Sequence, residues 1–303
     1  MMSIRTLSIS GAAVAALLSA GAAHASIVYD TSLANLNGPY GAGNASTTAD
    51  AHGTVTTVTG PSDNANRANA PFLLNTWAQH NVGGNASVGI TDTYARSGNG
   101  SLQFTGLDGA SKADLENYVL GGPSLASFQS ASYDWYRSSA STTSDIQLPS
   151  LRLYVSNGTT NGTLIFEPYY QGQLIVEDSW QTTIFTMSSV AWAKPSPLAH
   201  GAAASCDSAA CFDSLANFST VNPGLFVTGY STGIGSGWSG SFDGAVDNVA
   251  FTFAGQTSSF NFEVADRGGA VPEPASWALM LMGFAGLGAM LRRARRNGAF
   301  ATT

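Results

Sequence analysis

The hydrophobic residues between Ser26 and Ala270 come in short runs that alternate with polar residues, and this two-residue period is what most limits the fold. A period of two places every second side chain on one face, which is the pattern of a half-buried β-strand. No long stretch in this part of the sequence has the 3.6-residue period of an amphipathic helix. The runs that we expect to be strands are 54–58, 101–105, 151–155, 164–169, 174–176, 182–186, 225–229, 246–253 and 260–262.

Turn-forming pairs separate these runs. They are Asn99-Gly100, Gly121-Gly122, Asn157-Gly158 and Asn161-Gly162, and Gln171-Gly172 between two apolar runs predicts a hairpin. Many short strands with regular turns predict an all-β fold, a β-sandwich or jelly roll, over residues 26–270. Residues 31–70 are poor in aliphatic side chains, so we expect an extended loop or a peripheral strand pair there.

The first 25 residues predict a signal peptide. A short apolar region ends in Ala23-His24-Ala25, an A-x-A cleavage site that makes Ser26 the first mature residue. The partners that this implies are the Sec translocon and signal peptidase. The alternative is an uncleaved membrane anchor, but the apolar region is short and weakly hydrophobic for that.

The other end of the chain predicts a single transmembrane helix. Residues 275–291 are uncharged and mostly apolar, and Arg292, Arg293, Arg295 and Arg296 follow at once. Clustered arginines hold their end of a helix in the cytoplasm, so we expect the β domain outside and 297–303 as a cytoplasmic tail.

Pro272, Glu273 and Pro274 stand directly before this apolar stretch. Motif, helix and arginine cluster together make residues 271–296 resemble the PEP-CTERM sorting signal. Proteins of that family are substrates of exosortase, a membrane protease that recognises the Pro-Glu-Pro motif, in Gram-negative bacteria that make extracellular polysaccharide. The resemblance implies exosortase as a partner, an inner-membrane intermediate, and delivery to the outer surface or extracellular matrix. The alternative is an ordinary tail anchor after a proline-rich linker.

The charge distribution excludes one class of partner. The formal net charge is −7, but five arginines lie in the two terminal segments, so residues 26–270 carry 7 basic and 18 acidic residues, a net charge of about −11. An acidic surface repels phosphate backbones, so we expect no nucleic-acid binding. Such a surface is compatible with divalent cations or neutral glycans.

The chain has two cysteines, Cys206 and Cys211. Exported proteins meet oxidising conditions, so we expect a local disulfide; the alternative is two reduced thiols. Two cysteines alone do not make a structural zinc site, which normally has four ligands. His52, His80 and His200 are far apart in sequence and show no metal-ligand spacing.

Two segments resemble carbohydrate-binding modules of the jelly-roll type. Residues 96–102, RSGNGSL, resemble a turn-strand element of these modules, and 242–249, FDGAVDNV, resemble their closing strand, in which an aspartate often ligates calcium. The resemblance implies that this strand lies beside the first strand, 27–30, with Asp30 and Asp247 at a Ca²⁺ site. No other cofactor is expected. The alternative is that Asp247 makes turn or edge hydrogen bonds.

Exposed aromatic rings are the usual basis of sugar binding, because apolar sugar faces stack on flat rings while polar neighbours orient the hydroxyls. Each candidate has the alternative of a place in the core. The candidates are Trp135, Tyr169, Tyr170, Trp180 and Trp238.

Two of three patterns that suggest enzyme chemistry lack the context they need. The G-x-S-x-G pattern at 229–233 needs a following helix and a later histidine, and no histidine follows His200. The G-x-G-x-x-G pattern at 235–240 works only in a βαβ unit. Glu167 and Glu177 flank the expected hairpin, where they would face each other as a glycosidase pair does. We expect no enzyme; a glycoside hydrolase is the least favoured alternative.

These observations predict an exported cell-envelope protein with a structural or adhesive β-sandwich. The alternative is a carbohydrate-binding module with a calcium-stabilised jelly roll, which would bind soluble glycan through exposed Trp or Tyr.

Overall fold

The computed structural model describes residues 25–30, 33, 75–193, 198–207 and 210–265, and the backbone alone of 44–50 and 53–59. The predicted sorting tail and most of the predicted signal peptide, Ala23 included, lie outside these residues. Ala25 is exposed, and Ser26 begins the first strand. None of the helices within the described ranges has the length and apolar character to span a membrane.

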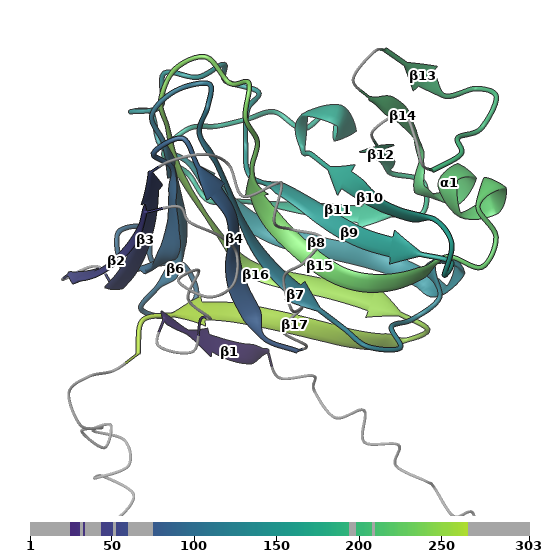
Figure 1. Ribbon diagram of the computed structural model, residues 1–303, viewed down its shortest axis with the longest axis horizontal. Coiled ribbons are helices and arrows are strands. Elements are labelled where there is room, and N and C mark those ends of the chain that lie inside the picture. The colour runs from purple at the N-terminus through teal and green to yellow at the C-terminus, as the bar shows by residue number, and fades with distance from the viewer. Residues whose placement is uncertain are drawn as a thin grey trace, which may run out of the picture.

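The described chain forms two β-sheets, so the predicted all-β sandwich is confirmed (Figure 1). The nine-stranded sheet A has the order β1-β17-β16-β6-β5-β3-β2, with β8 joining β16 to β11. Its strands are β1 (Ser26–Tyr29), β2 (Asn44–Asp50), β3 (Gly53–Thr59), β5 (Ser87–Thr91), β6 (Ser101–Gly106), β8 (Phe128–Arg137), β11 (Gln181–Thr186), β16 (Phe242–Phe253) and β17 (Gln256–Glu263).

The eight-stranded sheet B has the order β13-β14-β12-β10-β9-β15-β7-β4. Its strands are β4 (Trp77–Gly83), β7 (Lys112–Tyr118), β9 (Ser150–Ser156), β10 (Asn161–Phe166), β12 (Val190–Ala193), β13 (Ser205–Cys206), β14 (Cys211–Ser214) and β15 (Phe226–Ile234). Within the described residues, the strands are connected by the short helices η4 (Leu125–Ser127), η5 (Tyr169–Gln171) and α1 (Leu215–Val221).

Aromatic side chains hold the inner faces of the two sheets together. Tyr230 of sheet B stacks on Phe251 of sheet A with ring centroids 4.2 Å apart. Phe166 of sheet B likewise lies 5.0 Å from Phe185 of sheet A. Burial of such rings and of the aliphatic residues around them is the main favourable term in a sandwich of this size.

Most expected strands are present, and residues 44–50 and 53–59 form the peripheral strand pair, at the edge of sheet A. Some expectations were wrong. Residues 174–176 are not in a strand, and β10 ends at Phe166, so that Gly172, with φ of 72°, ends the helix η5 instead of turning a hairpin. Asn161-Gly162 lies within β10. The first strand, β1, pairs with β17 and not with the predicted 246–253 strand.

Seven strands were not anticipated: β4, β5, β7, β8, β12, β13 and β14. Several carry polar side chains that the folded chain buries, for example Asp114 and Glu116 in β7. A charged residue at every second position hides the apolar alternation when only local sequence is considered, although Ala113 and Leu115 of β7 do reach the core.

Candidate functional site

The outward face of sheet B, the face turned away from sheet A, carries a continuous row of side chains. Leu151 and Leu153 enter the core, so Arg152 between them points outward. The pairing of neighbouring strands aligns Arg152 with one outward-facing residue on each of six other strands, so that seven residues form a row. In order from β4 to β14 the row is Ala78, Glu116, Ser231, Arg152, Ile165, Trp192 and Phe212.

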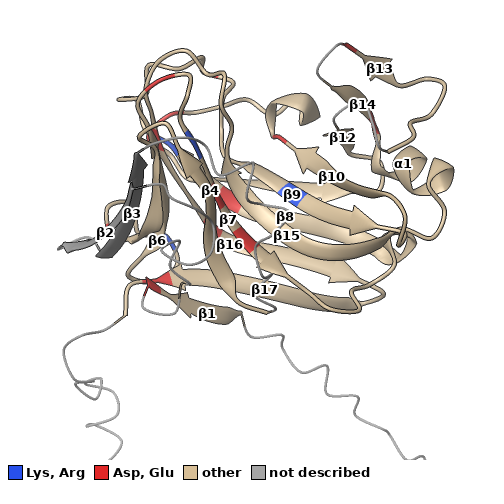
Figure 2. Ribbon diagram, viewed as in Figure 1, with Lys and Arg blue, Asp and Glu red and all other residues tan. Residues whose placement is uncertain are grey.

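One half of this face is a buried ionic network. Arg152 Nη1 donates to Asp114 Oδ1 at 2.5 Å, and Asn81 Nδ2 donates to Asp114 Oδ2 at 2.9 Å. Burial alone would lower the pKa of Arg152, but the negative charge of Asp114, aided by Tyr154 and Glu116, raises it. Figure 2 shows the acidic positions on β7 and the basic position on β9 in the middle of the sheet.

Glu116 is the second centre of the network. Its carboxylate accepts from Tyr154 at 2.5 Å and from Tyr118 at 2.7 Å, and it lies 2.6 Å from His80 Nδ1. The rings of Tyr118 and Tyr154 stack with centroids 5.4 Å apart. These contacts hold the polar groups in one arrangement, which is what an oriented binding surface needs.

The strand β15 crosses beneath these bridges and presents only small residues to them. A Cβ at Gly233 would lie 2.1 Å from Asp114 Oδ1, and a Cβ at Gly229 would lie 3.0 Å from the ring of Tyr118. Ser231 stands between them. The G-x-S-x-G pattern at 229–233 is therefore the outward face of a strand, made small because side chains from β7 and β9 pass over it.

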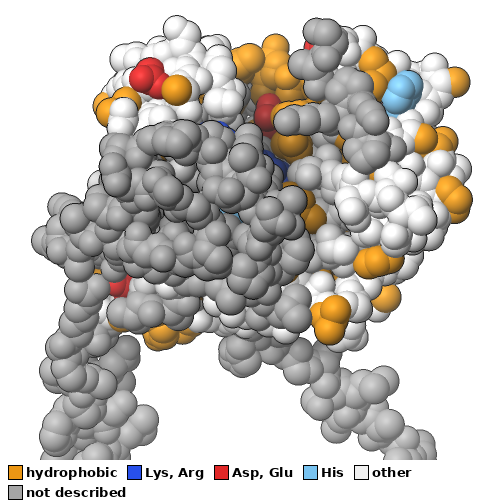
Figure 3. Space-filling model, in the orientation of Figure 1, with side chains coloured by type: hydrophobic (Ala, Val, Ile, Leu, Met, Phe, Trp, Pro, Cys, Tyr) orange, Lys and Arg blue, Asp and Glu red, His pale blue; other side chains and the backbone are white. Residues whose placement is uncertain are grey.

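The other half of the face is aromatic and open. Tyr169 and Tyr170 of η5 are 44% and 39% exposed, and Tyr170 packs on Phe212 with centroids 4.8 Å apart. Trp192 lies 6.4 Å from Phe212. Gln171 fastens η5 to β12 by donating to the carbonyl of Val190 at 2.8 Å. Figure 3 shows hydrophobic side chains exposed beside charged ones in the upper middle of the molecule.

Glu167 lies where the two halves meet. It accepts from Trp192 Nε1 at 3.4 Å. Burial raises its pKa, and the bond from Trp192 and the charge of Arg152 partly offset that rise. Glu177 instead pairs with the buried Arg137 of sheet A at 3.1 Å. The two glutamates do not flank a strand hairpin, so the geometry predicted for a glycosidase pair is wrong.

One of the predicted sugar-stacking residues belongs to the core, and another packs against it. Trp135 is fully buried and donates to Thr183 at 2.8 Å, so its prediction as an exposed platform was wrong. Trp238 is partly buried and packs edge-on against Phe242.

Trp180 belongs to a second aromatic group, near sheet A. Tyr94 stacks on Tyr136 with centroids 4.4 Å apart, Tyr136 lies 5.7 Å from Trp180, and the guanidinium of Arg96 lies 5.8 Å from the Trp180 ring. The hydroxyl of Tyr94 donates to Asp243 at 2.6 Å; burial and this bond raise its pKa to about 12.

The two predicted calcium ligands, Asp30 and Asp247, are both buried, and each contacts the backbone near the C-terminal end of β17. Asp247 accepts the amide protons of Phe262 at 3.0 Å and Ser97 at 3.2 Å, and Asp30 accepts that of Ala265 at 2.7 Å. Such hydrogen bonds to the backbone are what the alternative to a calcium site predicts for Asp247. Carboxylate oxygens also have the chemistry that calcium prefers, so a site at Asp30 and Asp247 stays a prediction.

The predicted disulfide between Cys206 and Cys211 is present and joins β13 to β14.

The network on sheet B was missed because its residues are distant in sequence. The alternation in 151–155 does place Arg152 and Tyr154 on one face, but nothing local shows that β7 supplies the facing carboxylates across β15. The aromatic cluster was found in part, through the adjacent Tyr169 and Tyr170.

Comparison with solved structures finds carbohydrate-binding modules. The family 11 module of the cellulosomal cellulase Lic26A-Cel5E of Clostridium thermocellum is 14% identical, with a TM-score of 0.34, over 60% of this chain and 89% of that chain. The same organism's family 11 module in complex with a β-1,3-1,4-mixed-linked tetrasaccharide is 15% identical, with a TM-score of 0.34, over 60% and 91%. No curated protein matches the chain.

Comparison with protein families identifies the C-terminal tail. The PEP-CTERM protein-sorting motif matches residues 270–296, which agrees with the resemblance seen at Pro272, Glu273 and Pro274. The chain therefore carries a PEP-CTERM sorting signal, which indicates an exported protein processed by exosortase.

Proposed function

We propose that this protein is an adhesive component of the cell envelope whose β-sandwich binds extracellular polysaccharide on the outward face of sheet B. The observation that carries the proposal is the row from Glu116 through Arg152 and Ile165 to Trp192 and Phe212, in which fixed charged groups are followed by partly buried aromatic rings that adjoin the exposed Tyr169 and Tyr170.

The aromatic half supplies the apolar contact. Sugar rings have apolar faces that pack on flat aromatic side chains, and tyrosines present such a surface at low cost in side-chain entropy. Tyr169 and Tyr170 are the exposed members of the cluster, and Phe212 supports Tyr170 from below.

The polar half supplies orientation. Glu167, at the boundary, is an acceptor for sugar hydroxyls within reach of the Trp192 ring. The charge of Arg152, which the bond to Asp114 holds in place, favours the ionised form of Glu167. A neutral or weakly charged polysaccharide suits this surface better than a polyanion, because the β domain is acidic.

The test is retention of the purified protein on the producing organism's own extracellular polysaccharide. Tyr170→Ala and Trp192→Ala each remove one ring, and we expect at least about ten-fold weaker binding for each. Ile184→Ala is the matched control, because Ile184 is an exposed hydrophobic residue of β11 in the other sheet.

Absence of retention for the wild-type protein would contradict polysaccharide binding and leave a scaffold or protein-adhesion role. Loss of binding in Trp180→Ala with normal binding in Tyr170→Ala would place the site on the second aromatic group instead.

A further inference from the structure

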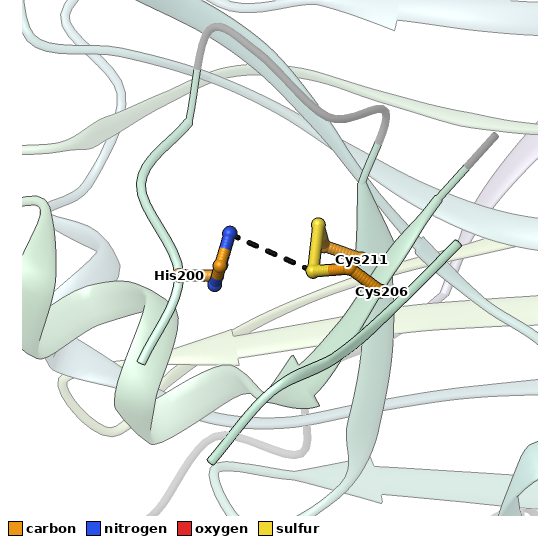
Figure 4. A group of neighbouring side chains, drawn as sticks. All are labelled: His200, Cys206 and Cys211. Atoms are coloured by element: carbon orange, nitrogen blue, oxygen red, sulfur yellow. Dashed lines mark hydrogen bonds between the residues drawn. A yellow bond between two sulfur atoms is a disulfide. The ribbon is translucent and has the colours of Figure 1, made fainter. Parts of the chain in front are cut away.

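Three metal-ligating side chains meet beside the β13–β14 hairpin (Figure 4). His200 Nε2 lies 3.6 Å from Cys206 Sγ, and Cys206 is bonded to Cys211. The ligand atoms of the three residues all lie within 4.8 Å of one another, and no other group of this kind occurs in the described part of the chain. His200 and Cys206 are exposed, so the cluster is open to solvent.

We propose that the reduced form of this hairpin binds a thiophilic cation, Zn²⁺ or Cu⁺, through the two thiolates and the imidazole, and that the disulfide is the closed form of the site. A tetrahedral zinc ion with ordinary bond lengths of about 2.3 Å to sulfur and 2.0–2.1 Å to nitrogen sets those two atoms about 3.6 Å apart. His200 and Cys206 already have this separation. Three protein ligands leave a fourth position for water or another small ligand.

The orientation of His200 is that of a metal ligand. Its Nδ1 lies 3.2 Å from the carbonyl oxygen of Gly201. That hydrogen bond requires the proton on Nδ1, which leaves the lone pair of Nε2 directed at Cys206. A carbonyl partner on the far nitrogen is the usual way in which proteins set the tautomer of a ligating histidine.

The backbone on both sides of His200 is fastened. Asn222 binds Ala199 twice, accepting its amide proton at 3.0 Å and donating to its carbonyl at 2.7 Å. Gly201 donates to Asp213 Oδ2 at 2.8 Å, and Asp213 belongs to β14, the strand that begins with Cys211. The imidazole is thus held over the hairpin by contacts to α1 and β14, which a disulfide that only staples the hairpin does not require.

The chemistry of opening needs an external thiol reductant. Two thiols, or one dithiol, pass two electrons to the Cys206–Cys211 bond and become a disulfide themselves, which leaves two cysteine thiols in the protein. Binding of the cation then displaces one proton from each thiol to solvent, and the oxidation state of the cation does not change. Exchange with an external disulfide, which takes up the two electrons and is reduced to two thiolates, re-forms the Cys206–Cys211 bond, removes two of the three ligands and releases the ion.

The test uses Co²⁺ as a spectroscopic substitute for Zn²⁺ on the full chain in mild detergent. The protein is reduced with a phosphine, freed of reductant without air, and titrated with Co²⁺ and then with competing Zn²⁺. Because the chain has only two cysteines, a thiolate-to-cobalt charge-transfer band reports on this hairpin alone. We expect one Co²⁺ per reduced chain, displaced by Zn²⁺, and none for the oxidised chain.

His200→Ala leaves both cysteines and the fold in place, because His200 is exposed, and we expect at least ten-fold weaker cobalt binding. Thr220→Ala, an exposed change on the neighbouring helix α1, should leave binding unchanged. Absence of the charge-transfer band in the reduced wild-type chain overturns the proposal, and so does equal affinity of the His200→Ala and wild-type chains. The proposal does not depend on polysaccharide binding, which is measured with the disulfide intact.

Discussion

Arg152 on β9 donates to Asp114 on β7 across the intervening strand β15, at a distance of 2.5 Å. The side chain of Asp114 is fully buried and that of Arg152 is 12% exposed, so each charge is stabilised by its partner in place of water. Such a bridge is possible only if the crossed strand is narrow at that point, and Gly233 provides this. The same bridge holds Arg152 near Glu167 at the edge of the aromatic cluster.

Replacement of Gly233 by alanine should break this bridge. The added Cβ would lie 2.1 Å from Asp114 Oδ1 and 2.4 Å from the carbonyl of Ala113. We expect a loss of about 2 kcal/mol or more in the free energy of unfolding, measured by denaturant titration. Gly235→Ala is the control, because no atom lies within 4 Å of its added Cβ. Equal stability of the two variants would show that the crossing is not tight.

Removal of the Arg152 charge should lower the free energy of unfolding more than removal of the charge of an exposed arginine does. Arg152→Met removes a charge that directly contacts the buried Asp114, and we expect about 3–5 kcal/mol of destabilisation. Arg96→Met is the matched control, since Arg96 is 39% exposed in its pair with Asp134 and should cost about 1 kcal/mol or less. The double variant Arg152→Met/Asp114→Leu should recover much of the lost stability, and failure to recover it would argue against the broken Arg152–Asp114 pair as the cause.

Asp247 should make stability fall as pH rises from 4 to 7. Burial raises its pKa from 3.8 to about 6; amide bonds from Phe262, Asn248 and Ser97 oppose the rise, and the charge of Glu263 adds to it. The folded chain therefore holds this proton more tightly than the unfolded chain. Protonated Asp247 therefore contributes about 3 kcal/mol to the free energy of unfolding. This contribution is fully present below pH 3.8 and is lost as the pH rises through 6.

The measurement for this prediction is urea unfolding of the wild-type and Asp247→Asn proteins at a series of pH values in EDTA. The difference in unfolding free energy between the two proteins should change over pH 4–7 in the stated direction. Parallel pH curves would show that Asp247 does not titrate with a raised pKa.

Calcium should stabilise the wild-type protein if Asp30 and Asp247 bind it. A ligand that binds only the folded state raises the melting temperature with its concentration. Because the cation must displace the proton of Asp247, the effect should be larger at pH 7 than at pH 5. Thermal unfolding with calcium and with EDTA measures this. An equal calcium effect in Asp30→Asn/Asp247→Asn would place the ion elsewhere, and no effect in the wild type would remove the site.

Local sequence was enough for the elements whose pattern repeats over a few residues. The run 151–155 predicts β9 because Leu151, Leu153 and Val155 alternate with polar residues, and all three reach the core. The run 164–169 extends beyond β10 because Tyr169 is typical of a strand, whereas Pro168 is the N-cap of the helix η5. The strand β7 was missed because its outward residues are charged, and only neighbouring strands make their burial acceptable.

Local sequence is sufficient to predict the alternation within β9, the disulfide between two cysteines separated by 5 positions, and the sorting motif at 270–296, since each depends on residues close together in the chain. Packing of distant segments brings Arg152 to Asp114, places Trp192 and Phe212 in the same row, and sets His200 beside Cys206. Strand order and register are set by core packing between segments far apart in the chain, and a local pattern assigns a side chain to a face without naming the neighbours that it meets there.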